Sequence, residues 1–263
     1  RQAADGMIYV ASQGDGDSVM VFESTTDDNP SFQTSWGAQA IGIDYDQEYL
    51  YVGMNDFGSL SLERRALDGS EVVEYADAIA DFVEIWGLAV AKDGDVYVSG
   101  IKNVSVEISG DSTLVDRPVV RRFSPDSAFV PVERIIGPDV PSDSDPEIDV
   151  TYNDGKLYVT NPSGARSNKI VQLDANTLEP VNSFGSFPAD PADPDQGELY
   201  GPRRFVATGN SMITVIDEFA DSENVLNYDR LVQFAPDGSD WETFGATGTD
   251  ESEFRFFEHA NIP

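Results

Sequence analysis

The sequence predicts an all-β fold, a β-propeller of four-stranded antiparallel blades, and two observations support this prediction. Short runs that contain Tyr-Val or Thr-Val recur five times, at Tyr9, Tyr51, Tyr97, Tyr158 and Thr214. They are rich in β-branched and aromatic residues, and their spacings of 42, 46, 61 and 56 residues indicate one equivalent strand per repeat. Three further strand-like runs accompany them, and four strands in each repeat of this length are typical of a propeller blade.

The three accompanying runs keep the same order along the chain. The run before each Tyr-Val run is short and apolar: IGID (41–44), LAVA (88–91), IDVT (148–151) and FVAT (205–208). The run after it has a polar break, as in VVRRFSPDS (119–127), KIVQLDANT (169–177) and RLVQFAPDG (230–238). The last run often closes on a large apolar residue and Gly: Trp36-Gly37, Ile136-Gly137, Phe184-Gly185 and Phe244-Gly245.

This order resembles the NHL repeat of β-propellers, with Gly201 to Gly248 as the best match and the second repeat as the poorest. The resemblance covers essentially the whole chain and implies one propeller domain over residues 1–263. Propellers of this kind include scaffolds, ligand binders, lactonases and lyases, so the resemblance indicates the fold more strongly than the function.

Five blades are favoured, because each of the five Tyr-Val or Thr-Val runs has its own flanking strands. Residues at about 100–117, which contain the alternating VSVEI, are expected to form a hairpin insertion in blade 3. Joining the C-terminal ANIP to the N-terminal RQAADGMIYV imitates the start of another repeat, so both termini are expected to build blade 1 and close the ring. A natural chain that extends beyond these ends would allow six blades.

Composition narrows the range of partners. The 263 residues include 16 Lys and Arg against 48 Asp and Glu, which gives a net charge of −32. Only four of the 16 basic residues are Lys. Such a chain repels nucleic acid and anionic membranes, and it has no apolar run long enough for a membrane span, so neither nucleic-acid binding nor membrane insertion is expected. The absence of Cys excludes disulfides and thiolate sites.

The same composition leaves the habitat open. An acid-rich, Lys-poor chain is similar to proteins of salt-loving organisms, in which concentrated salt screens the self-repulsion. An acidic exported protein is the equally weighted alternative. We therefore expect a monomer in a secreted, periplasmic or cell-envelope location, with halophilic adaptation as an open possibility.

Candidate site residues lie just before or within the innermost strands, because the loops that enter these strands converge at one mouth of a propeller. Oxygen ligands from four such residues would suit Ca²⁺: Glu84, Glu147, Asp149 and Asn261. The resemblance to lactonase-type propellers implies an axial Ca²⁺, although EIWG (84–87) is only a loose echo of their E-G-P-x-W opening. Two stretches, GDGDS (14–18) and SDSDPEID (142–149), resemble pieces of calcium loops but lack the full EF-hand spacing, and solvated acidic turns are the favoured alternative for them.

Two further candidates are the only histidine and an arginine pair. His259 could act as a general base, with a structural role near the terminus as the alternative. Arg203 and Arg204, with Trp86, could bind a planar anion such as a carboxylate at the mouth, and ion pairing with nearby carboxylates is the alternative.

The sequence therefore supports two alternative functions. One is a non-catalytic extracellular or envelope-associated propeller that binds a protein or a small ligand. The other is a Ca²⁺-dependent lactonase-like hydrolase or lyase with an axial active site. Three or more oxygen ligands around one point would favour the enzyme, and a wide, empty or arginine-filled channel would favour binding.

Overall fold

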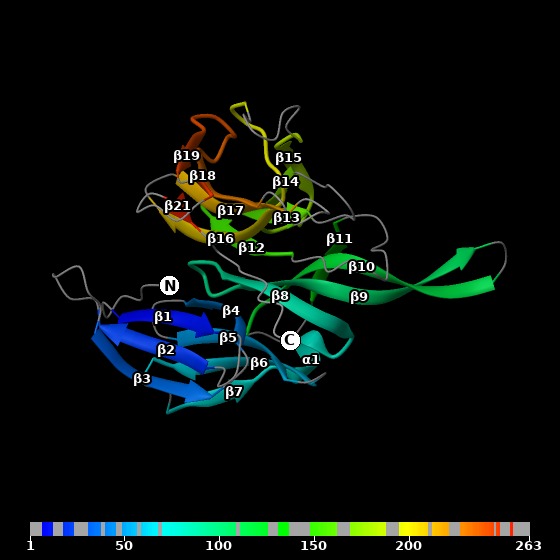
Figure 1. Ribbon diagram of the computed structural model, residues 1–263. Helices are drawn as coiled ribbons and strands as arrows, with labels where there is room; N and C mark the ends of the chain where they lie inside the picture. The colour runs from blue at the N-terminus through cyan, green and yellow to red at the C-terminus, as the bar shows by residue number, and fades with distance from the viewer. Residues whose placement is uncertain are drawn as a thin grey trace, which may run out of the picture.

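A computed structural model shows a ring of five small antiparallel sheets, a five-blade β-propeller (Figure 1). The described residues are 7–12, 18–23, 31–37, 40–45, 49–56, 59–67, 70–108, 111–125, 131–136, 148–161, 169–187, 195–209, 212–220, 227–244, 246–247 and 253–254. The predicted all-β fold with five blades is confirmed.

The strands follow the order predicted from the repeats. Blade 1 holds β1 (Met7–Ser12), β2 (Ser18–Glu23) and β3 (Ser31–Gly37), and blade 2 holds β4 (Ala40–Tyr45), β5 (Tyr49–Asp56), β6 (Ser59–Ala66) and β7 (Val72–Glu74). Blade 3 holds β8 (Phe82–Val90), β9 (Val96–Ile108), β10 (Asp111–Phe123) and β11 (Val132–Ile135). Blade 4 holds β12 (Val150–Asn153), β13 (Lys156–Asn161), β14 (Lys169–Asp174) and β15 (Pro180–Phe184), and blade 5 holds β16 (Pro202–Gly209), β17 (Met212–Ala220), β18 (Asn227–Phe234) and β19 (Glu242–Phe244).

Among the described residues, three elements lie outside the blades. The short helix α1 (Ala76–Ile79) follows β7, where the second repeat matches the pattern least well, and β20 (Ala246–Thr247) pairs in parallel with β21 (Glu253–Phe254). Blade 1 has three described strands, and the C-terminal residues expected to complete it, 255–263, lie outside the described residues. No helix in the described ranges is long and apolar enough to cross a membrane.

The hydrophobic core lies between neighbouring blades rather than at one centre. Four apolar clusters join blades 1 and 2, 2 and 3, 3 and 4, and 4 and 5. The tyrosines of the repeated Tyr-Val runs, which mark the repeats in the sequence, are almost completely buried: Tyr9, Tyr51, Tyr97 and Tyr158. Two of them reach into the next blade, because Tyr9 donates a hydrogen bond to the carbonyl of Leu67 and Tyr158 to that of Pro236.

Blade 3 carries the longest strands. Residues 100–117 lie within a continuous hairpin of β9 and β10, paired from Phe123 with Val96 to Asp111 with Ile108. The flanking strands β8 and β11 pair only with its base, so the outer part is a two-stranded ribbon that extends beyond the ring (Figure 1).

Candidate functional site

The carboxylates near the propeller axis are held by backbone amides of neighbouring blades. Asp149, which precedes β12 and is 8% exposed, accepts hydrogen bonds from the backbone N–H groups of Val150 at 2.9 Å and of Phe205 at 2.7 Å. Asp44 of blade 2 accepts one from the N–H of Val90 of blade 3 at 2.8 Å. Hydrogen bonds to backbone amides stabilise a buried carboxylate, so these two residues tie one innermost strand to the next.

Trp86 and Arg204 meet at the inner side of the ring. They are 118 positions apart and belong to blades 3 and 5, which are not neighbours. The Arg204 guanidinium lies 5.6 Å from the centre of the Trp86 ring and donates a hydrogen bond to the Trp86 carbonyl. The Trp86 indole N–H donates in turn to Glu84 at 3.1 Å. An arginine side chain of blade 5 therefore contacts blade 3, and three predicted site residues, Glu84, Trp86 and Arg204, form one cluster.

Arg203 is connected to Asp149 through Thr160. The Thr160 hydroxyl contacts the Arg203 carbonyl at 3.3 Å and the Asp149 backbone N–H at 2.8 Å. Arg203 is half-buried, as is Arg204. The structure thus brings together five of the residues predicted at the mouth: Glu84, Trp86, Asp149, Arg203 and Arg204.

The other predicted site residues, Glu147, His259 and Asn261, lie outside the described residues. Within the described part of the chain, no group of three or more His, Asp or Glu residues could hold a metal ion. Of the two described residues predicted as Ca²⁺ ligands, Asp149 directs both carboxylate oxygens to backbone amides and Glu84 holds an indole N–H. These two residues fit a structural role better than a metal site.

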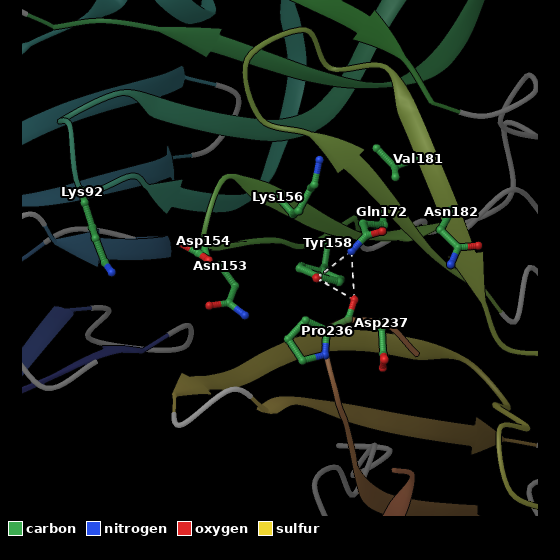
Figure 2. A pocket seen from close by; sticks show the side chains of 10 residues that line it. All are labelled: Lys92, Asn153, Asp154, Lys156, Tyr158, Gln172, Val181, Asn182, Pro236 and Asp237. Carbon is green, nitrogen blue, oxygen red and sulfur yellow. Dashed lines mark hydrogen bonds between the residues drawn. The ribbon is translucent and has the colours of Figure 1, made fainter. Parts of the chain in front are cut away.

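A pocket of about 600 Å³ opens at the opposite ends of the innermost strands (Figure 2). Its walls come from three blades, namely the β8–β9 turn of blade 3, the body of blade 4 and the β18–β19 turn of blade 5. The charged lining residues are Lys92, Lys156, Asp154 and Asp237, so formal positive and negative charges are equal in number. Two of the four lysines of a strongly acidic chain therefore line this one pocket.

A row of side chains across blade 4 forms the floor of this pocket. Tyr158, Gln172 and Asn182 are register partners on β13, β14 and β15, so they share one face of the sheet. The Tyr158 hydroxyl donates to the Pro236 carbonyl at 2.9 Å, and the Gln172 amide nitrogen donates to the Tyr158 hydroxyl at 2.7 Å and to the Pro236 carbonyl at 2.9 Å (Figure 2). Burial raises the pKa of Tyr158, which keeps its hydroxyl protonated as a donor.

This pocket is not among the sites predicted from the sequence, because those predictions concern the loops that enter the innermost strands. A signal was nevertheless present. The three turns that frame the pocket each contain Asp-Gly, in KDG (92–94), NDG (153–155) and PDG (236–238). The three glycines have φ values of 87°, 79° and 84°, a left-handed conformation that these tight turns require.

No protein-family model matches the chain, and no curated protein matches it by sequence. The hydrazine synthase of Kuenenia stuttgartiensis aligns with 78% of this chain and 49% of its own, at 15% identity and a TM-score of 0.48. A protein described as a candidate 6-phosphogluconolactonase from Bacteroides uniformis aligns with 95% of this chain and 71% of its own, at 14% identity and a TM-score of 0.49. The chain spans about half the length of the hydrazine synthase chain.

Proposed function

We propose that this β-propeller is a non-catalytic binding protein, located in the secreted, periplasmic or cell-envelope space, that recognises a protein or a small ligand. The observation that carries the proposal is the contact of Arg204 with Trp86 at the inner side of the ring. An arginine-filled mouth is suited to recognition, because Trp and Arg are the side chains most often responsible for binding energy at protein surfaces. The proposal includes Arg203, the adjacent residue, as a second arginine, because guanidinium groups suit planar anions.

The hydrogen bonds that Asp149 accepts from backbone N–H groups near the axis support the same proposal. A hydrolytic metal centre needs several oxygens that converge on one point and remain available to the ion. Asp149 gives its two oxygens to the N–H groups of Val150 and Phe205. A lactonase-like enzyme would therefore depend mainly on residues outside this described cluster.

The proposal also includes the repeat type and the oligomeric state. The order of runs from Gly201 to Gly248 supports repeats of the NHL type, and the net charge of −32 supports a monomer with a strongly solvated surface. Adaptation of that surface to high salt would act through screening of carboxylate repulsion.

The deciding experiment is thermal unfolding in 2 mM Ca²⁺ against EDTA, at low and high NaCl, together with an assay for δ-gluconolactone hydrolysis at about pH 7. We expect NaCl to raise the Tm, Ca²⁺ to have no additional effect, and hydrolysis to match the uncatalysed rate. A Ca²⁺-specific rise in Tm together with hydrolysis that EDTA abolishes would contradict the proposal and favour the enzyme.

A further inference from the structure

The pocket over blade 4 contains an amide oxygen, Gln172 Oε1, to which no described residue donates a hydrogen bond. Gln172 is 8% exposed, and its amide orientation is fixed because its nitrogen faces the Pro236 carbonyl, which can only accept. Its Oε1 atom has no hydrogen-bond donor among the described residues, and Figure 2 shows this oxygen on the Asn182 side of the amide. This oxygen is accessible from the pocket, so a ligand hydroxyl or amide N–H can donate a hydrogen bond to it.

Free donors lie around the same space. The Lys92 ammonium, which comes from blade 3, has no ion pair within the part of the chain that the structure describes. The Asn182 Oδ1 accepts from the N–H of Ser183 at 2.9 Å, which leaves the Asn182 NH₂ group for the pocket. Asn153, at the end of β12, offers both an acceptor and a donor.

The balance of charges and the apolar lining restrict the ligand class. Lys92 and Lys156 are matched by Asp154 and Asp237, and Lys156 is also paired with Asp174 at 3.2 Å, so the pocket does not favour an anion. Side chains that donate and side chains that accept lie together, which suits hydroxyl groups because each hydroxyl does both. Val181, which is 53% exposed, and Pro236 provide apolar surface for the C–H face of a ring.

We infer that this pocket binds a neutral carbohydrate of one to three sugar units, with Gln172 and Asn182 as hydrogen-bonding residues and Lys92 as a donor from the neighbouring blade. The inference rests on the proposed binding function and names its ligand class and site. A pocket of about 600 Å³ is large enough for such a ligand.

The test is isothermal titration calorimetry and saturation-transfer NMR of the full chain with glucose, maltose, cellobiose, trehalose and sucrose, and with glucuronate and glycine as charged probes. At least one neutral sugar should bind, and Lys92→Ala and Asn182→Ala should each weaken its binding about five- to tenfold. Lys169→Ala is the matched control, because Lys169 is an exposed lysine at the opposite end of the blade 4 sheet and should leave binding unchanged. Gln172→Leu should abolish binding, and the two exposed substitutions keep the test valid if this variant unfolds.

The outcomes separate this inference from the proposed function. No binding of any neutral sugar, or binding of glucuronate or glycine alone, would overturn the carbohydrate assignment and leave a binding function for other ligands intact. Sugar binding that Lys92→Ala and Asn182→Ala do not weaken would overturn the location in this pocket. Conversion of the bound sugar, detected by NMR in the same samples, would overturn the proposed non-catalytic function.

Discussion

Asp149 and Phe205 join two blades of the propeller through a hydrogen bond of 2.7 Å between a carboxylate oxygen and a backbone nitrogen. Asp44 and Val90 form the same kind of contact between blades 2 and 3 at 2.8 Å. Adjacent blades share few backbone hydrogen bonds, because each sheet satisfies its own strands. Carboxylates that accept from the next blade therefore link the sheets where the ring is narrowest.

Asp149→Asn should lower the free energy of unfolding by about 1 to 3 kcal/mol, because the amide retains one acceptor for two buried N–H groups and directs its own donor at the other. Urea unfolding followed by circular dichroism measures the change. Asp154→Asn is the control, since Asp154 is exposed at a φ of 46°, which Asn tolerates, and its change should stay below about 0.5 kcal/mol.

The same pair of variants distinguishes a structural Asp149 from a metal ligand. A structural residue predicts an equal loss of stability in Ca²⁺ and in EDTA. A loss of stability that appears only in Ca²⁺ would contradict the inter-blade role. It would support Asp149 as a Ca²⁺ ligand, as predicted from the sequence.

The fold could be predicted because its signal is repeated. Each of four blades buries a tyrosine at the equivalent position: Tyr9, Tyr51, Tyr97 and Tyr158. Because the same buried position recurs in each blade, the sequence shows a regular repeat. The meeting of Trp86 with Arg204 also followed from topology, since innermost strands converge wherever they lie in the chain.

The role of individual polar residues could not be predicted in this way. Sequence pattern places Asp149 near the axis, yet whether its oxygens face an ion or a backbone amide depends on the offset between two strands 56 positions apart. The pocket was missed for a related reason. Lys92, Asn153 and Pro236 lie in turns of three different blades, and only the three-dimensional ring brings these turns together.

Gly87→Ala should be among the most destabilising single changes in blade 3. A Cβ atom at this position would lie 2.5 Å from the Ser99 hydroxyl and 2.7 Å from the Val150 nitrogen, and it would also collide with the Asp149 carboxylate. Overpacking of this kind costs about 3 kcal/mol, because strands β8 and β12 must separate. Gly94→Ala, where nothing lies within 4 Å and only the φ of 87° is unfavourable, should cost about 1 kcal/mol. Equal losses in urea unfolding would contradict close contact between these strands.

Asp217 and Arg230 form a buried ion pair that should show strong coupling. Their side chains are 0% and 8% exposed, and the carboxylate accepts from Arg230 Nε at 2.8 Å and from the N–H groups of Tyr200 and Gly201. Arg230→Met should cost about 3 to 5 kcal/mol, because it leaves the buried Asp217 carboxylate without its counterion.

The double variant Asp217→Asn/Arg230→Met should recover most of that loss. Asn retains an acceptor for the two N–H groups, and Met replaces the guanidinium with an apolar side chain that needs no counterion. A double-mutant cycle from urea unfolding measures the coupling energy. Strictly additive losses would show that the two charges do not depend on each other.

The free energy of unfolding should also depend on pH through the ionisation of Asp217. Burial, only partly offset by Arg230, raises the pKa of Asp217 from 3.8 to about 6. A carboxyl whose pKa is higher in the folded state binds more protons when folded, so its stabilising contribution is complete below pH 3.8 and is lost as the pH rises through 6. Relative to the Asp217→Asn/Arg230→Met variant, wild-type stability should therefore fall by about 2 kcal/mol between pH 4 and pH 7. The comparison removes the general effect of the other carboxylates, which titrate in both proteins. A difference between the two proteins that stays constant from pH 4 to pH 7 would mean that Arg230 and the two backbone amides keep Asp217 ionised throughout.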